Sequence, residues 1–353
     1  MTRIFFPPLP QADLDHIFSR LGETDWKFFA NKRIFITGGS GYIGKWLLSA
    51  LLYANQRMSL NCRIEVLTRS PDQFSISAPH IAHARYVTLR QGDVRSFDFP
   101  SGPLDIVVHA ATDVAVENKP IETFSTCVEG TSRVLEFARV SGAKDFLLTS
   151  SGAIYGKIPP AIPCVDEDYP GGPDPTSPAS AYGEGKRVAE WLACTQGLQT
   201  GLRVKIVRIY AQVGPYLPLD KQFAIGNFIA DALAKRDITI RGDGTPLRSY
   251  LHAADTTIWL LAALIRGSPN RAWNVGGEDA ISIYELARLV AKLLRAKSEI
   301  KILTKADTNR PAERYIPNVT RAKSELRLPS EISLHDAIIR TAHWLAKNTG
   351  VHR

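Results

Sequence analysis

Tyr182 and Lys186 are the residues of this chain best suited to proton transfer, and they stand four positions apart. On a helix this spacing places both side chains on one face. The ammonium group then favours the phenolate, which would let the phenol exchange a proton nearer neutral pH. Behind a turn that cradles a dinucleotide, such a pair predicts hydride chemistry at a carbonyl or carbinol carbon. Exposed pairs with this spacing are also common on helices that do no chemistry, so the prediction depends on the residues around it.

A glycine-rich turn lies upstream of this pair. Gly38, Gly41 and Gly44 follow a predicted strand, Arg33 to Thr37, and open a predicted helix. In that context the first glycine permits a tight turn, the second lets a pyrophosphate approach the backbone, and the third lets helix and strand pack closely. The free N–H groups and the dipole at the helix N-terminus favour the phosphates. The turn therefore predicts a bound dinucleotide cofactor.

The end of the second predicted strand distinguishes between the two nicotinamide cofactors. Thr68 and Arg69 stand where an NAD-binding protein usually places Asp or Glu to bind the ribose 2′-hydroxyl. Arg69 can form charge-assisted hydrogen bonds to a 2′-phosphate, so the sequence predicts NADP(H), with NAD(H) as the alternative. Asp93, after the third predicted strand, could accept a hydrogen bond from the adenine amino group or cap the next turn. The expected cofactor contacts are Gly38, Ser40, Gly41, Tyr42, Ile43, Gly44, Thr68, Arg69, Asp93, Val94, Ala110, Ala111, Tyr182 and Lys186.

Short apolar strands alternate with amphipathic helices as far as residue 210. The expected strands are residues 33–37, 63–68, 86–89, 105–110, 145–150 and 204–210, and the expected helices include 43–54, 121–140 and 181–194. This alternation predicts an α/β fold with a Rossmann-type, doubly wound parallel sheet that is covered on both faces.

The regular alternation of strands and helices ends near Gly214, and the different order beyond it predicts a smaller C-terminal α/β lobe that binds the substrate. We expect helices at 223–235, 253–265, 283–294 and 333–347, strands at 238–241 and 299–303, and the segment 273–277 in the same lobe. The chain then divides into an N-terminal appendage (1–30), a region that is mainly the NADP(H)-binding domain (31–213) and a region that is mainly the substrate-binding lobe (214–353). One helix near 13–21 is expected in the appendage, packed on the body or on a neighbouring subunit. The Pro- and Gly-rich segment 158–178 is interpreted as a lid or surface loop.

Composition describes an ordinary globular protein. The 353 residues are 44% hydrophobic and 22% charged, with a net charge of +8. This mild positive bias suits phosphorylated small molecules, and no zinc or helix-turn-helix pattern points to nucleic acid. The four cysteines have no metal-ligand or redox spacing, which predicts reduced thiols, no metal and a cytoplasmic location. No apolar stretch is long enough to predict a membrane span.

Taken together, these motifs resemble the extended short-chain dehydrogenase/reductase family, in particular its nucleotide-sugar epimerases, dehydratases and ketoreductases. The likeness runs from about residue 33 to about residue 328. It rests on the segments 37–44, 109–111, 149–156, 242–250 and 274–277 together with the Tyr182-x-x-x-Lys186 pair.

The resemblance implies roles for individual residues. Ser151 corresponds to the catalytic hydroxyl, Tyr182 to the acid/base and Lys186 to the lysine that binds the ribose; alternatively, Ser151 only caps the end of a strand. A hydroxyl at Ser151 can stabilise charge that builds on the reacting oxygen. Arg248 and Arg310 resemble the residues that clamp the diphosphate of a sugar nucleotide, although either could be a surface ion-pair partner. A homodimer is expected.

Departures from the family pattern reduce the number of family reactions expected for this chain. The 4,6-dehydratases place an Asp-Glu pair where this chain has Gly152 and Ala153. Without these two carboxylates, no group at this point can act as acid or base in the elimination of water from the sugar. Ala211 and Cys127 replace asparagines of the family, so the substrate and cofactor contacts of those asparagines are not expected in this chain. Arg69 weakens the epimerase interpretation, because epimerases of this family keep NAD tightly bound.

The leading hypothesis is an NADP(H)-dependent reductase of the C4 ketone of a nucleotide-linked 4-keto-6-deoxy sugar, in polysaccharide precursor synthesis, with Tyr182 as general acid. One alternative is a nucleotide-sugar C4 epimerase with tightly bound NAD(P). Another is a non-catalytic, cofactor-sensing protein on the same fold.

Overall fold

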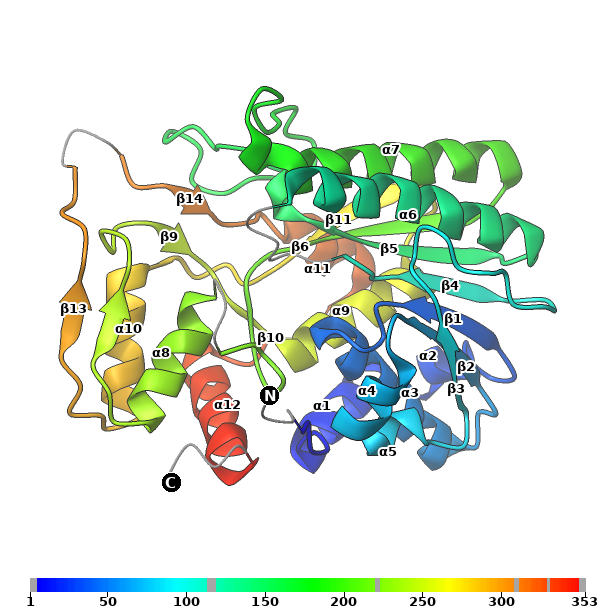
Figure 1. The fold of residues 1–353 in the computed structure, drawn as a ribbon, viewed down its shortest axis with the longest axis horizontal. Coiled ribbons are helices and arrows are strands. Elements are labelled where there is room, and N and C mark those ends of the chain that lie inside the picture. Colours follow the sequence, from blue (N-terminus) through cyan, green and yellow to red (C-terminus); the bar gives the residue numbers. More distant parts are fainter. Residues whose placement is uncertain (1–4, 113–118, 220–222, 308–310, 329–330, 349–353) are drawn as a thin grey trace.

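A seven-stranded parallel sheet forms the centre of the molecule in the computed structural model (Figure 1), which describes residues 5–112, 119–219, 223–307, 311–328 and 331–348. The strand order is β11-β6-β5-β4-β1-β2-β3. The strands are β1 (Arg33–Thr37), β2 (Arg63–Thr68), β3 (Val87–Gln91), β4 (Ile106–His109), β5 (Asp145–Ser151), β6 (Arg203–Ile209) and β11 (Arg271–Val275). The chain builds outward from β1 to β3 and then returns to β4 on the other side of β1. This reversal confirms the predicted doubly wound fold and places a crevice at the carboxyl ends of β1 and β4.

Helices cover both faces of the sheet (Figure 1). The long helices α6 (Pro120–Val140) and α7 (Ala181–Thr200) lie side by side on one face, and α3 (Tyr42–Met58) and α9 (Ala253–Arg266) cover the other. Strand β1 shows how the sequence produces two cores. Ile34 and Ile36 are buried on the side of α3 and α9, whereas Phe35 is buried on the side of α6 and α7. Alternate side chains of a buried strand face opposite layers, which explains its continuous apolar run.

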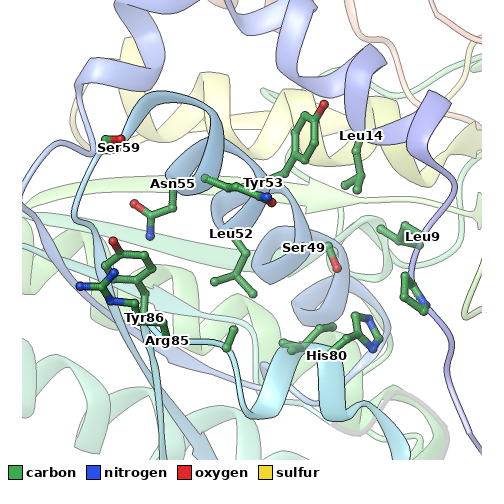
Figure 2. A pocket seen from close by; sticks show the side chains of 14 residues that line it. Leu9, Leu14, Ser49, Leu52, Tyr53, Asn55, Ser59, His80, Arg85 and Tyr86 are labelled. Atoms are coloured by element: carbon green, nitrogen blue, oxygen red, sulfur yellow. The ribbon is translucent and has the colours of Figure 1, made fainter.

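The N-terminal segment packs on the body of the same chain. Helix α1 (Gln11–Leu21) confirms the expected helix, and α2 (Glu23–Lys27) follows it. Ile17, Trp26 and Phe29 are fully buried in the core that α3 and α9 share. A surface groove of about 540 Å³ lies between this segment, the second half of α3 and residues 80–86. Figure 2 shows Leu9, Tyr53 and His80 among its lining residues. None of the predicted site residues lines this groove.

In the described residues, the C-terminal lobe is built from helices and three small sheets. Strand β8 (Ile238–Ile240) pairs with β13 (Ile300–Ile302), β9 (Leu247–Arg248) lies between β12 (Ile281–Ser282) and β14 (Arg314–Tyr315), and β7 (Gln212–Val213) pairs with β10 (Leu251–His252). The lobe helices are α8 (Ala224–Leu233), α10 (Ile283–Leu293) and α12 (Leu334–Asn348). Helices α4 (Pro71–Ser77) and α5 (Pro79–Ala82) lie outside this lobe, between β2 and β3, and α11 (Thr320–Leu326) follows β14.

One expectation about this lobe was wrong. The segment 273–277 was expected to belong to the lobe, but residues up to Val275 form β11 and pair in parallel with β6 of the main sheet. Helix α9 likewise packs against β5 and β6. The chain therefore passes through the smaller lobe and returns to complete the main sheet.

The segment 158–178 is a loop whose middle is held to the C-terminal lobe. Val165 N donates to Ile316 O at 3.1 Å, and Asn318 N donates to Val165 O at 2.7 Å. Within the described ranges, none of the helices combines the length and apolarity needed to cross a bilayer. The same residues contain no cluster of three or more His, Cys, Asp or Glu side chains that could hold a metal ion.

Candidate active site

The glycine turn is packed too closely for side chains at two of its three spaced glycines. Gly38 has a φ of +71°, and a Cβ there would come within 2.5 Å of the Ala110 carbonyl oxygen. A Cβ on Gly44 would come within 2.3 Å of the Gly38 carbonyl oxygen, whereas one on Gly41 would meet only that oxygen, at 3.1 Å. Helix α3 begins at Tyr42 with no side chain capping its N–H groups. The turn therefore fits the pyrophosphate of a nicotinamide dinucleotide, which Gly41 and the first turn of α3 would hold.

The other predicted cofactor contacts lie along the same edge of the sheet. Ser40 Oγ is 3.4 Å from Oγ1 of Thr68, the last residue of β2. Ile43 lies half-buried in the first turn of α3. Val94 is buried against α6, where a Cβ on Gly130 would come within 2.9 Å of it. Segments far apart in the sequence thus meet at the carboxyl ends of the strands, where this fold binds its ligands.

A buried hydrogen-bond network fixes the residues after β4. Thr37 Oγ1 accepts from the backbone N–H groups of Ala110 and Ala111 at 3.2 and 3.1 Å, and it lies 2.7 Å from Nδ1 of His109. Nε2 of His109 lies 3.0 Å from Oγ1 of Thr131. Burial lowers the pKa of His109 to about 3, so the ring is neutral and serves as a structural link. This network holds Ala110 and Ala111 against the glycine turn.

Asp93 caps its own turn. Its carboxylate accepts from Arg95 N at 2.9 Å and forms a two-point contact with the Arg95 guanidinium at 2.8 and 3.0 Å. Arg95, with a smaller contribution from Arg69, lowers the pKa of Asp93 to about 2. Of the two roles predicted for Asp93, the structure contains the turn cap. Arg69 is exposed at the end of β2, close enough to influence Asp93.

Lys45 lies beneath the glycine turn, and sequence analysis missed it. Its ammonium donates to the Ser40 carbonyl oxygen at 2.8 Å and lies 4.1 Å from the centre of the Phe6 ring. The residue is only 4% exposed, and burial lowers its pKa to about 8. The only sequence signal was a lysine directly after the third glycine of the turn. A positive charge so close to the turn should attract the pyrophosphate.

We therefore expect dinucleotide affinity to fall roughly threefold to tenfold as the pH rises from about 7 to about 9, because Lys45 then loses its proton. The Lys45→Met variant should bind more weakly at about pH 7 and show little change across this range. Calorimetric titration with NADPH at several pH values measures both effects, with Lys45→Arg as the variant that keeps its charge. A parallel fall in the wild type and Lys45→Met would contradict the role of this ammonium.

Lys186 projects from α7 into the catalytic centre. Its ammonium donates to Thr112 Oγ1 at 2.8 Å and to the Thr149 carbonyl oxygen at 2.7 Å, and it lies 5.9 Å from the centre of the Tyr182 ring. Burial lowers its pKa. Cys127 is buried close by, and Lys186 acts against the burial that raises the pKa of this thiol. The one-face arrangement of Tyr182 and Lys186 was predicted; the two threonine partners were not.

The pKa of Tyr182 departs from expectation. The helical spacing predicted that the ammonium would bring the phenol nearer neutrality, but burial raises the pKa of Tyr182 and the Ser151 hydroxyl opposes this only in part. The Lys186 ammonium donates its hydrogen bonds to Thr112 and Thr149, and it lies 5.9 Å from the centre of the Tyr182 ring. The phenol therefore stays protonated at neutral pH, which suits it to give a proton.

Ser151 ends β5 next to a tyrosine that sequence analysis missed. Its Oγ accepts from Ala153 N at 3.1 Å and lies 3.4 Å from the hydroxyl of Tyr315. Tyr315 belongs to β14, in register with Arg248 of β9, and the Arg248 guanidinium lies 5.7 Å from the centre of its ring. The structure thus brings Ser151 close to both Tyr182 and the predicted diphosphate clamp Arg248. Arg310, the other predicted clamp residue, lies outside the described residues.

Arg248 also has the surface contact that was considered as its alternative. Its Nη2 lies 3.8 Å from Oε2 of the exposed Glu313, and its Nη1 donates to the Leu247 carbonyl oxygen at 3.0 Å. The pair with Glu313 is long and solvent-accessible, so it is weak. Arg248 therefore remains available to a stronger anionic partner.

Gly152 occupies the first of the two positions where dehydratases carry acids. A Cβ there would come within 2.5 Å of the Tyr210 ring. An acidic side chain at this position would have to displace that ring, which packs on Tyr315 with ring centres 4.5 Å apart. The packing around Tyr210 therefore leaves no room at Gly152 for the acidic side chain of a dehydratase.

Comparison with known proteins identifies the family of the chain. Residues 34–276 match the model of the NAD dependent epimerase/dehydratase family. The chain is 30% identical over 324 residues to UDP-glucuronic acid decarboxylase 5 of Arabidopsis thaliana, covering 92% of each chain. Its fold is similar to UDP-N-acetylglucosamine 4-epimerase of Methanobrevibacter ruminantium M1 (TM-score 0.77, 18% identity, 90% of this chain and 99% of that one). It is also similar to the dTDP-glucose 4,6-dehydratase DesIV of Streptomyces venezuelae (TM-score 0.76, 23% identity, 90% and 98%), whose structure contains NAD. The chain therefore belongs to the NAD-dependent epimerase/dehydratase family and is an NAD(P)-dependent enzyme of the extended short-chain dehydrogenase/reductase type.

Proposed function

We propose that this enzyme reduces the C4 ketone of a nucleotide-linked 4-keto-6-deoxy sugar with NADP(H). The observation that carries the proposal is the placement of the Tyr182 phenol beside the Ser151 hydroxyl, with the Lys186 ammonium 5.9 Å from the centre of the Tyr182 ring, since a phenol in this position can donate a proton to a forming alkoxide. The bound cofactor would supply the hydride. Tyr182 would protonate the oxygen while the Ser151 hydroxyl hydrogen-bonds it, and Lys186 would bind the ribose.

Epimerisation at C4 is the second candidate. It needs oxidation followed by reduction on the other face, and both steps use only a hydride and the Tyr182 proton. The lack of a carboxylate at Gly152 and Ala153 leaves this chemistry possible, and solved structures of similar fold include nucleotide-sugar 4-epimerases. The names of the curated relatives add decarboxylation of a nucleotide-linked uronic acid as a further activity to test.

A panel of sugar nucleotides separates these activities. The purified enzyme is incubated with NADPH and UDP-, dTDP-, GDP- and CDP-linked 4-keto-6-deoxy sugars, and with the corresponding hexoses and UDP-glucuronic acid. One NADPH oxidised per sugar reduced supports the reductase. A C4 epimer formed without net cofactor use indicates the epimerase, and carbon dioxide release indicates a decarboxylase. Cofactor binding without turnover of any substrate would favour the sensing protein.

The NADP(H) preference rests on Arg69 at the end of β2. We expect Arg69→Asp to lower NADPH affinity roughly tenfold to a hundredfold and to make NADH the tighter ligand, because a charge-assisted contact to the 2′-phosphate becomes a repulsion. Arg63→Asp, at the exposed first residue of the same strand, is the charge-matched control and should change neither affinity. Calorimetry with both cofactors gives the result. Equal affinities that neither substitution alters would refute the preference.

We also propose a homodimer through the outer faces of α6 and α7. These neighbouring helices expose large apolar side chains, with Ile121 at 84%, Trp191 at 65% and Leu198 at 78% exposure. Exposed apolar side chains on two adjacent helices are typical of an interaction surface, and a second copy of this chain is the proposed partner.

Trp191→Glu should therefore shift the protein from dimer to monomer in sedimentation or light scattering, because a charge would be buried at the interface. The control is Leu303→Glu, which changes a residue of the same 65% exposure in the C-terminal lobe and should remain dimeric. A wild-type protein that is monomeric at micromolar concentration would exclude this dimer.

A further inference from the structure

Tyr315 reaches the catalytic centre from the other lobe. It belongs to β14, in the small sheet with β9, yet its hydroxyl lies 3.4 Å from Ser151 Oγ at the end of β5. The two residues are 164 positions apart in the chain. A phenol placed next to a catalytic hydroxyl by a different lobe invites a functional explanation.

The Tyr315 ring is held from two sides. Tyr210, which follows β6, packs on it with ring centres 4.5 Å apart and planes tilted by 37°. The Tyr210 side chain is itself closely confined, because a Cβ on Gly152 would come within 2.5 Å of its ring and a Cβ on Gly276 within 2.8 Å of its Cβ. On β9, the Arg248 guanidinium lies 5.7 Å from the centre of the Tyr315 ring. These contacts restrict the Tyr315 ring and therefore keep its hydroxyl near Ser151.

The hydrogen-bonding capacity of Ser151 decides what this contact can do. A serine hydroxyl has two acceptor lone pairs and one hydrogen to donate. One lone pair already receives the Ala153 N–H at 3.1 Å. If the Tyr315 hydroxyl donates to the other, the Ser151 hydrogen must point to a third partner. Burial raises the pKa of Tyr315, so its phenol retains the hydrogen that this requires.

We propose that Tyr315 is a positioning residue that donates to Ser151 Oγ and thereby directs the Ser151 hydroxyl hydrogen toward the reacting sugar oxygen. The inference rests on the proposed catalytic role of Ser151. Without the Tyr315 donor, Ser151 would be free to turn its hydrogen away from the substrate, and part of its stabilising effect would be lost. Since Tyr315 lies against Arg248, the same contact links the expected diphosphate clamp to the catalytic hydroxyl.

A double-mutant cycle tests this arrangement with Tyr315→Phe, Ser151→Ala and the double variant. Phenylalanine keeps the ring contacts and removes only the hydroxyl. We expect Tyr315→Phe to lower kcat about 5- to 30-fold, the kinetic size of one lost hydrogen bond, with little change in KM. In the Ser151→Ala background the same change should lower kcat by less than about twofold, because there is no longer a hydroxyl to position.

The control is Tyr169→Phe, which removes a phenol hydroxyl from the neighbouring cluster formed by Tyr155, Val165 and Tyr210 and should leave kcat unchanged. Thermal unfolding and NADPH binding of each variant show whether the fold and the cofactor site are intact. If the effects of Tyr315→Phe and Ser151→Ala multiply independently, Tyr315 does not act through Ser151 and the inference is overturned alone. If Ser151→Ala leaves kcat unchanged, Ser151 has no catalytic role, and both that proposal and the inference about Tyr315 are refuted.

Discussion

Replacing Tyr182 with phenylalanine is expected to lower kcat by roughly two to four orders of magnitude, the usual contribution of a general acid. The ring would keep its place near Lys186, so the fold and the cofactor affinity should stay close to those of the wild type. Steady-state turnover and calorimetry with NADPH measure the two properties. Tyr86→Phe, at the amino end of β3, serves as the matched control. Near-normal turnover of Tyr182→Phe on the true substrate would show that another group supplies the proton.

The pH profile of reduction follows from the same residue. Burial raises the pKa of Tyr182, so the acid form persists through neutral pH and is lost only at alkaline pH. The kcat of the wild type should therefore be level around neutrality and fall as the pH rises through the alkaline range. This alkaline fall should be absent from the residual activity of Tyr182→Phe. An acid limb that depends on Tyr182 would contradict the direction of its pKa.

Arg248→Ala should raise KM for the sugar nucleotide about tenfold to a hundredfold while changing kcat little. A guanidinium can bind two charged diphosphate oxygens at once, and this binding is the same in the ground state and the transition state, so its loss appears in KM. NADPH affinity should be nearly unaffected. Arg236→Ala, which removes an exposed arginine of the same lobe paired with Asp231, is the control. Arg248→Lys should recover part of the affinity, because it keeps the charge but not the planar fork.

The same variant tests the substrate class. A sugar ketone without a nucleotide has no diphosphate for Arg248 to hold, so its reduction, where it occurs, should be equally fast with and without the arginine. An enzyme that prefers an uncharged ketone over every nucleotide sugar, and whose Arg248→Ala variant behaves like the wild type, would be a general carbonyl reductase of this family.

Local sequence patterns predicted the elements that carry the site. Apolar runs such as Arg33 to Thr37, followed by spaced glycines, specify a strand, a tight turn and a helix within a short stretch of chain. Tyr182 and Lys186 were found because helical spacing is also a local property. The direction of the Tyr182 pKa was not predictable in this way, since burial depends on packing against distant segments.

Contacts between distant residues were beyond prediction for the same reason. Tyr315 lies in a two-residue strand and meets Ser151 across 164 positions, so no periodicity points to it. Lys186 donates hydrogen bonds to Thr112 and Thr149, which are 74 and 37 positions away in the sequence. The pairing of β11 with β6 is a further case, because an isolated apolar strand does not reveal which sheet it joins.

The late return of β11 to the main sheet has a consequence for biosynthesis. Until residue 275 has left the ribosome, β6 is an open edge strand whose backbone N–H and C=O groups lack their parallel partner. The nascent chain must therefore hold an incomplete cofactor-binding sheet while most of the smaller lobe is still being made. A shortened chain that stops near residue 213 would carry the whole glycine turn and the Tyr182–Lys186 pair, yet it would lack β11 and α9. We expect such a fragment to self-associate through that open edge rather than bind the dinucleotide as an independent unit.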